Sequence, residues 1–336
     1  MTLIGLVTDY EVGYKPLIIS SHTMLSKTWL LIANPTSGGG KFRQNRAQIE
    51  QILQDLNLSY VLRVTEKGGD ATRFATEGIA AGHRKIIAMG GDGTGNEVIN
   101  GIFKQKIVPT TEIIYTLLPV GTGNDWARNW KLPKNIRLFF QMIQREKTAW
   151  QDIGVIRYSK QNDNQGVVSE HFFANAGGAG YDAEVVHSVE FSKRLISKKF
   201  SYFWHILKCL NQYKASKVRV TFDGETVIDK FYTINFGIHR CSGAGMQLTP
   251  HAIADDGLLA LTLIRDLPRL RVLAHAPKLY LGTVAKIKPY TTLHQVKTIQ
   301  IESLDAPMRV ETDGEFLGQT PIEITILQKA LKIIIL

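Results

Sequence analysis

Three glycine-rich turns are the segments of this sequence whose residue types could bind phosphate. They read NPTSGGGK at 34–41, GGDGTGNE at 90–97 and LPVGTGND at 118–125, and each is preceded by a short apolar run. Glycines let backbone N–H groups approach an anion closely, and the N-terminus of a following helix adds partial positive charge. The turns therefore predict a phosphate ligand. For each turn taken alone, a capped strand-to-helix turn without a ligand is the alternative.

Two carboxylates could do chemistry beside such a ligand. Asp92 follows two glycines, and Glu315 ends the motif Asp-Gly-Glu at 313–315. Phosphoryl transfer needs in-line positioning, neutralisation of charge on the γ-phosphate, and a group that accepts the hydroxyl proton. Asp92 could act through Mg²⁺, Glu315 could face a bound alcohol, and Asp125 could support the same network. An Asp-Gly turn with a solvated glutamate is the alternative for 313–315.

Alternating strand and helix patterns predict how these residues are positioned. From residue 28 to about 150, apolar runs alternate with amphipathic segments such as 43–58, where Ile49, Ile52, Leu53 and Leu56 have helical spacing. This predicts an α/β domain with a parallel sheet over 27–150, and open sheets of this kind bind ligands at the carboxyl ends of their strands.

After Trp150 the sequence predicts a different architecture. Short β-type stretches are separated by Gly, Asn and Asp turns, with helices only near 191–214 and 270–281. We expect a mostly antiparallel β domain over 151–336, and the return of its last segment to the first domain stays open. Residues 1–26 fit neither domain and are an N-terminal extension.

Composition limits the class of protein. The 336 residues are 44 % hydrophobic and 21 % charged, which excludes disorder, and the net charge of +10 favours contact with phosphates, nucleic acid or an anionic membrane. Two isolated cysteines, Cys209 and Cys241, are typical of free thiols in the cytoplasm. No apolar run approaches the roughly 20 residues of a membrane-spanning helix, and no secretory signal is expected.

Several other chemistries are not supported by the motifs. Lys41 is followed by Phe42, so the first turn is not a Walker A loop. Residues 178–183 formally match the dinucleotide fingerprint GxGxxA, but only weakly, because no acidic strand end follows about 20 residues later. The histidines show no zinc-ligand spacing and the nucleophile motif GxSxG is absent, which argues against a transition-metal site and an α/β-hydrolase.

Taken in order, the motifs resemble those of the diacylglycerol kinase catalytic-domain family, which also holds sphingosine kinases and bacterial soluble lipid kinases and is more distantly related to NAD kinases. The segments that carry the resemblance are NPTSGGGK, GGDGTGNEVING, LPVGTGNDWAR, ANAGGAGYDAEV, GAGMQLTPHAIADDGLL and TDGE, from Asn34 to Glu315. GGDGT alone is shared with NAD kinases and phosphofructokinases, whereas the ordered set is specific.

The resemblance implies an ATP site in a cleft between the domains, a Mg²⁺ ion and a general base. Glu315 matches the position of the proposed base. Asp256, with the carbonyls of Ile253 and Leu258, matches a structural Mg²⁺ site. The positions matched to ATP are Asn34, Pro35, Thr36, Ser37, Gly38, Thr65, Gly91, Asp92, Gly93, Thr94, Gly95, Asn96, Glu97 and Thr122.

The sequence thus predicts a cytoplasmic lipid kinase that uses ATP and Mg²⁺, with diacylglycerol as the first choice of acceptor and phosphatidic acid as product. An NAD kinase and a non-catalytic nucleotide- or lipid-binding regulator are the alternatives. The basic and aromatic segment 193–214 predicts peripheral contact with an anionic membrane, or else packs its apolar side on the β domain. Nucleic acid is not an expected partner, and a homodimer stays open.

Overall fold

The computed structural model describes residues 11–12, 25–121, 123–159, 168–191, 208–210, 212–243 and 245–336. Two compact units make up the chain. The first comprises residues up to Trp150 together with Leu331–Leu336, and the second comprises Gln151–Ala330. Most of the expected N-terminal extension at 1–26 and most of the expected helix at 191–214 lie outside the described residues.

The first unit contains a parallel sheet. Its strands β2 (Trp29–Ala33), β3 (Tyr60–Val64), β4 (Lys85–Gly90) and β5 (Ile114–Pro119) are arranged in the order β3-β2-β4-β5, and every neighbouring pair is parallel. The short β1 (Glu11–Val12) pairs antiparallel with β3. At the other edge, the end of β16 (Ile322–Ile334) pairs parallel with β5.

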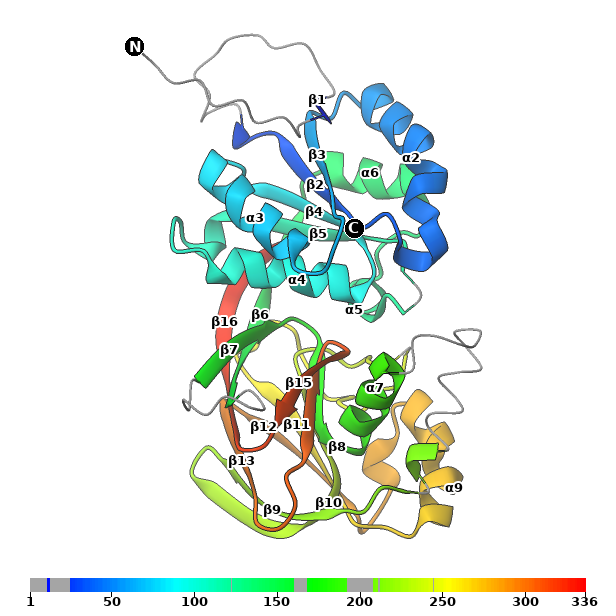
Figure 1. The fold of residues 1–336 in the computed structure, drawn as a ribbon, viewed down its shortest axis with the longest axis vertical. Coiled ribbons are helices and arrows are strands. Elements are labelled where there is room, and N and C mark those ends of the chain that lie inside the picture. Colours follow the sequence, from blue (N-terminus) through cyan, green and yellow to red (C-terminus); the bar gives the residue numbers. More distant parts are fainter. Residues whose placement is uncertain are drawn as a thin grey trace. The chain divides into compact units, whose positions relative to one another are not determined.

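Helices follow the strands of this sheet (Figure 1). They are α2 (Ser37–Asp55), α3 (Asp70–Ala81), α4 (Asp92–Lys104), the short α5 (Asp125–Asn129) and α6 (Ile136–Gln144), with a 3₁₀ turn at Thr110–Glu112. All five residues of β2 are buried, as expected for a parallel strand covered on both faces. The α/β prediction for this part of the chain is confirmed.

The second unit is mostly antiparallel. Its strands are most of β6 (Thr148–Ser159), β7 (Val168–Phe173), β8 (Ala176–Gly180), β9 (Ser216–Phe222), β10 (Glu225–Gly237), β11 (Leu259–Arg265), β12 (Thr291–Val296), β13 (Thr298–Ser303), β14 (Arg309–Thr312), β15 (Glu315–Gln319) and most of β16. The long β10 pairs antiparallel with β8, β9 and β11. Helices α7 (Tyr181–Phe191) and α9 (Arg269–Tyr280) and a 3₁₀ turn at Val284–Lys286 complete it. The expected helix at 270–281 is confirmed as α9.

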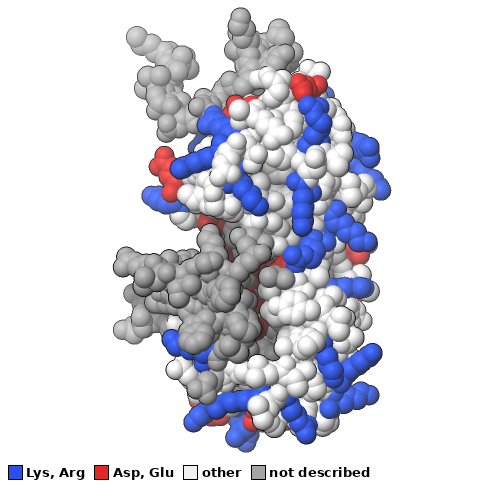
Figure 2. Space-filling model, turned by 90° about the vertical axis from the view of Figure 1, so that its right-hand side faces the viewer, with Lys and Arg blue, Asp and Glu red and all other residues white. Residues whose placement is uncertain are grey.

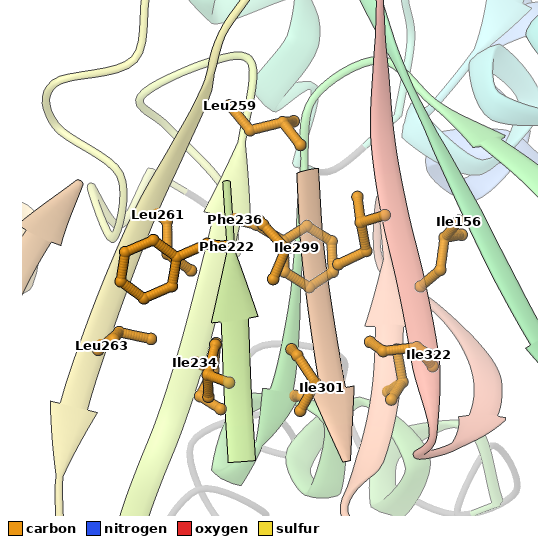
Figure 3. Close-up of a cluster of buried hydrophobic side chains, with 14 of the residues drawn as sticks. Ile156, Phe222, Ile234, Phe236, Leu259, Leu261, Leu263, Ile299, Ile301 and Ile322 are labelled. Carbon is orange, nitrogen blue, oxygen red and sulfur yellow. The ribbon is translucent and has the colours of Figure 1, made fainter. Parts of the chain in front are cut away.

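Side chains from most strands of the second unit form its core, part of which is drawn in Figure 3. The close-up shows aliphatic and aromatic groups of β6, β9, β10, β11, β13 and β16 directed into one layer. Phe236, Ile234 and Ile299 are fully buried there, and Phe173 packs edge-on against Phe236 with 5.5 Å between ring centroids. This layer fixes the strands from which the loops and hairpins of the second unit project.

The weak dinucleotide reading of residues 178–183 is wrong. The fingerprint requires a strand inside a parallel βαβ unit, whereas β8 lies between β10 and β14 and is antiparallel to both. The segment is therefore an interior strand followed by α7. Among the described residues, no helix is long and apolar enough to cross a membrane.

Replacing a core side chain tests which residues hold the second unit together. We expect Phe236→Ala to lower the free energy of unfolding by about 3–5 kcal/mol, because it leaves a cavity in the packed layer. On the same strand, Ile228 is 49 % exposed, and Ile228→Ala should cost less than about 1 kcal/mol. Chemical denaturation measures both values, and similar losses would contradict the assigned core.

Candidate functional site

The turn after β2 is tied to the first turn of α4 through Asn34. The Asn34 backbone N–H donates to the carbonyl of Met89 at the end of β4, 2.9 Å away. Its side-chain Oδ1 accepts hydrogen bonds from the backbone N–H and hydroxyl of Thr36 at 3.0 and 2.9 Å, and its Nδ2 donates to Thr94 Oγ1 at 3.3 Å. One amide side chain thus holds two of the predicted phosphate-type turns together.

Glycines allow the turns to approach each other through their backbones. Gly38 has a φ of 60°, and a Cβ there would overlap the carbonyl oxygen of Val120 in the turn after β5. A Cβ on Gly121 would likewise overlap the Cα of Gly91. The turns after β2, β4 and β5 therefore pack so closely that side chains are excluded at these contacts.

A cavity of about 170 Å³ opens beside these turns, at the carboxyl ends of β2, β3 and β4. Its lining includes three threonine hydroxyls, from Thr36, Thr65 and Thr94. The remaining lining residues are Asn34, Pro35, Glu66, Lys67, Gly68, Ala71 and Glu97. Pockets for whole cofactors are typically about 300–1,000 Å³, so this cavity fits one part of a nucleotide, such as the ribose.

Two carboxylates fix the loop that closes the cavity on the β3 side. Glu97 Oε2 accepts hydrogen bonds from the backbone N–H groups of Gly69 and Ala71 at 3.0 and 3.1 Å, which caps the start of α3. Asp70 Oδ2 accepts from the N–H groups of Glu66 and Lys67, and these bonds lower the pKa of Asp70. The loop is thereby held in one conformation.

Asp92 lies at the start of α4, beside the segment that leads into α5. Its Oδ1 accepts from the backbone N–H of Trp126 at 3.3 Å, and Oδ2 is close enough to Gly123 to crowd any Cβ there. Asp125 forms an ion pair with Arg128, whose guanidinium also donates to the Gly123 carbonyl at 3.3 Å. The structure therefore brings Asp92 and the segment around Asp125 together within the first unit.

The structure places the residues expected to bind ATP in three groups. Lining the cavity are Asn34, Pro35, Thr36, Thr65, Thr94 and Glu97. Ser37 and Gly38 are the first residues of α2, Gly91 directly precedes α4, and Asp92 and Gly93 are the first residues of α4. Gly95 and Asn96 are buried within α4, where Asn100 Nδ2 donates to the carbonyl and Oδ1 of Asn96. Thr122 lies outside the described residues.

In the second unit, a rigid hairpin positions Glu315. The turn between β14 and β15 consists of Asp313 and Gly314, with φ values of 51° and 82°, as in a type I′ turn. The Asp313 carboxylate accepts hydrogen bonds from the N–H groups of residues 174, 175 and 176 at 2.9–3.1 Å. Glu315, half-buried, is the first residue of β15, and its charge adds to burial in raising the pKa of Tyr158.

A buried polar network that the sequence analysis did not assign lies next to this hairpin. Glu311 and Asn235 pair with Gly178 from its two sides in the sheet. Asp182 accepts from the Thr233 hydroxyl at 3.0 Å and from the Asn235 amide, and it occupies space that a side chain at position 178 would fill. Burial raises the pKa of Asp182 to about 6 and that of Glu311 well above its usual range.

The sequence contained only a partial signal for this network. The glycines before Asp182 could have indicated close packing, but the partners of Asp182 come from a strand 50 or more residues away in the chain. Glu311 Oε2 accepts from the N–H of Gly314 at 2.9 Å, which links the network to the turn that precedes Glu315.

Asp256, in the loop expected to hold a structural Mg²⁺, accepts hydrogen bonds from within the loop and from β12. Asp256 Oδ1 accepts from the Leu258 N–H at 2.9 Å, and Oδ2 accepts from the Gln295 amide at 3.3 Å. No group of three or more His, Cys, Asp or Glu side chains that could hold a metal is found among the described residues. A carboxylate and two backbone carbonyls are oxygen ligands of the kind that Mg²⁺ prefers, so the site at Asp256, Ile253 and Leu258 stays a prediction.

Comparisons with known proteins agree with this architecture. Residues 28–156 match the diacylglycerol kinase catalytic domain, and residues 176–335 match the YegS C-terminal NAD kinase beta sandwich-like domain. Together they define a kinase built from a catalytic α/β domain and a β domain. The chain therefore contains a diacylglycerol kinase catalytic domain, as its motifs indicated.

Individual relatives cover most of the chain. A diacylglycerol kinase from Staphylococcus saprophyticus is 29 % identical over 87 % of this chain and 90 % of its own length, and one from Staphylococcus haemolyticus is 28 % identical over 90 % and 86 %. The fold is similar to a crystal structure of a diacylglycerol kinase from Bacillus anthracis, with a TM-score of 0.69, 24 % identity and coverage of 92 % and 97 %. Yeast NADH kinase shares the fold more distantly, with a TM-score of 0.51, 12 % identity and coverage of 91 % and 82 %.

Adjacent glycines offer a matched test of the packed turns. Gly38 and Gly39 both have positive φ, but a Cβ on Gly38 overlaps Val120 whereas a Cβ on Gly39 meets nothing within 4 Å. We expect Gly39→Ala to cost about 1–2 kcal/mol of unfolding free energy, and Gly38→Ala about 1–3 kcal/mol more, because it also forces the turns apart. Chemical denaturation measures the difference, and equal costs would contradict the close approach.

The buried carboxyl groups predict a pH dependence of stability. Folding raises the pKa values of Asp182 and Glu311. Asp182 therefore contributes its full stabilisation below its ordinary pKa of 3.8, and this stabilisation is lost as the pH rises through about 6. In the wild type, the free energy of unfolding should fall between about pH 4 and about pH 7. We expect this fall to be smaller in Glu311→Gln by about 1 kcal/mol or more.

The control is Glu302→Gln, which removes an exposed carboxylate paired with Arg219 in the same unit. Denaturation curves across the pH range should differ from wild type only for Glu311→Gln. A pH profile of Glu311→Gln that matches the wild-type profile would show that the buried pair does not titrate in this range.

Proposed function

We propose that this protein is a Mg²⁺-dependent lipid kinase that transfers the γ-phosphoryl group of ATP to a lipid hydroxyl, with diacylglycerol as acceptor and phosphatidic acid as product. The observation that carries the proposal is the cavity lined by Asn34, Thr36, Thr65, Thr94 and Glu97 beside the packed glycine turns. The curated relatives named diacylglycerol kinase support the choice of acceptor.

The lining of the cavity suggests how ATP is oriented. Glu97 is acidic and would repel phosphates, whereas its carboxylate and the threonine hydroxyls can hydrogen-bond a ribose. The glycines of these turns, Gly38, Gly39, Gly40, Gly91 and Gly93, have no side chains, so their backbone can approach an anion closely. We therefore place the ribose in the cavity and the triphosphate along the glycine turns.

Two carboxylates then take different roles in the transfer. Glu315 accepts the proton of the lipid hydroxyl while the hydroxyl oxygen bonds to the γ-phosphorus and ADP leaves. The Asp313 turn holds Glu315 in place, which lowers the entropic cost of positioning it. Asp92 has the ligand chemistry for Mg²⁺, and the ion would neutralise charge on the phosphates of bound ATP.

Transfer of labelled γ-phosphate tests the activity and the acceptor. Wild-type protein with Mg·ATP is offered diacylglycerol, other lipid alcohols in mixed micelles and, in parallel, NAD. We expect labelled phosphatidic acid. We expect Glu315→Gln to lower kcat by about 10²–10⁴ with little change in the KM for ATP, because a general base acts on the chemical step.

Glu170→Gln is the matched control, because it removes a half-exposed carboxylate of the same unit that pairs with Arg157. It should leave kcat unchanged. Label in NADP would replace the proposal with an NAD kinase, a reaction for which the similarity to yeast NADH kinase supports only the fold. Tight ATP binding without label in any product would favour a regulator.

A further inference from the structure

Helix α9 has a second apolar side that the described residues leave exposed. Val272 and Leu279 pack against the buried cluster that contains Leu267, Val284 and Ile287. Successive residues of an α-helix are rotated by about 100° around its axis, and this places another group of apolar residues on the opposite side of α9. These residues are Leu270, Leu273, Ala274, Pro277 and Tyr280, with Leu281 just beyond the helix end.

We call this group of residues on α9 the apolar strip, and its large side chains are unusually exposed. Leu270 is 81 % exposed, Leu281 72 %, Tyr280 52 % and Leu273 45 %. Single exposed leucines are common, but neighbouring ones along one helix side form a patch that typically marks an interaction surface. No residue of α9 is fully buried, so the helix lies on the surface of the second unit.

The charges around the strip select the kind of partner. On the helix, Arg269 borders one side of the strip, and Lys278 and Arg271 border the other. Residues 267–301 contain six Lys and Arg and no Asp or Glu. In Figure 2, which faces the side where α9 lies in Figure 1, blue Lys and Arg side chains border uncharged surface in the lower part.

We propose that α9 lies in the interfacial layer of an anionic membrane, with Leu270, Leu273, Tyr280 and Leu281 among the acyl chains and the basic residues at the headgroups. An apolar side flanked by Lys and Arg is the pattern of interfacial helices. The proposal rests on the proposed function insofar as such docking would bring the protein to its lipid substrate.

Sedimentation with vesicles tests this contact without any catalytic step. The full chain is mixed with phosphatidylcholine vesicles that contain or lack phosphatidylglycerol, in the absence of ATP. We expect binding to the anionic vesicles, weakened by added salt. The double variant Leu270→Gln/Leu281→Gln should bind about tenfold to a hundredfold more weakly, and Arg269→Gln about fivefold more weakly.

Ile228→Gln/Leu304→Gln is the control, because it removes two exposed apolar residues from other parts of the same unit. It should bind vesicles as wild type does. The α9 double variant should also retain activity on a water-soluble short-chain diacylglycerol and lose activity on diacylglycerol embedded in vesicles.

The outcomes separate this inference from the kinase proposal. Vesicle binding that depends on α9 supports docking even if no lipid is phosphorylated. Unchanged binding of the double variant overturns docking, whatever the kinase assay shows. A dimeric wild type that the double variant converts to monomer, with vesicle binding unaffected, would assign the strip to a second copy of the chain instead.

Discussion

The candidate nucleotide site depends on direct backbone contacts between the turns that follow β2, β4 and β5, where there is no room for side chains. Gly38 lies against Val120, and Gly121 lies against Gly91, so three strand-ending turns meet as bare backbone. Asn34 then links two of these turns through hydrogen bonds to Thr36 and Thr94. Because the strands β2, β4 and β5 are neighbours in a parallel sheet, their carboxyl ends are already at one edge, and the glycines only have to permit the final approach.

Several acidic residues of the described chain serve to hold loops. Glu97 caps α3, Asp70 accepts two N–H groups of the preceding loop, and Asp313 accepts three N–H groups from residues 174–176. Such charge-assisted bonds are stronger than neutral ones and fix loop conformation. These bonds separate the roles of two neighbouring carboxylates. Asp313 already accepts three hydrogen bonds and is poorly suited to accept a proton, so it holds the hairpin in place. Glu315, on the same hairpin, is the residue proposed to accept the proton.

The sequence predicted the strands, helices and turns well because each depends on local patterns. The glycine turns and the periodic segments 43–58 and 270–281 correspond to observed elements. What the sequence could not predict are contacts between residues distant in the chain. Glu97 was expected to bind ATP, but its bonds to Gly69 and Ala71 across 26 residues or more show that it also caps α3. The network of Asp182, Asn235 and Glu311 requires the order of strands β10-β8-β14, which no local pattern encodes.

The distribution of charge links the two proposals. From composition alone, the net charge of +10 could have served phosphate binding or membrane contact. In the candidate site, however, Arg73 pairs with Asp70 and Arg128 pairs with Asp125, and much of the expected phosphate contact falls to backbone N–H groups. Residues 267–301, by contrast, hold six basic residues and no acidic one. Because positive charge acts over roughly a Debye length of about 10 Å, its concentration around an exposed apolar helix is more effective at a membrane than at a single phosphate.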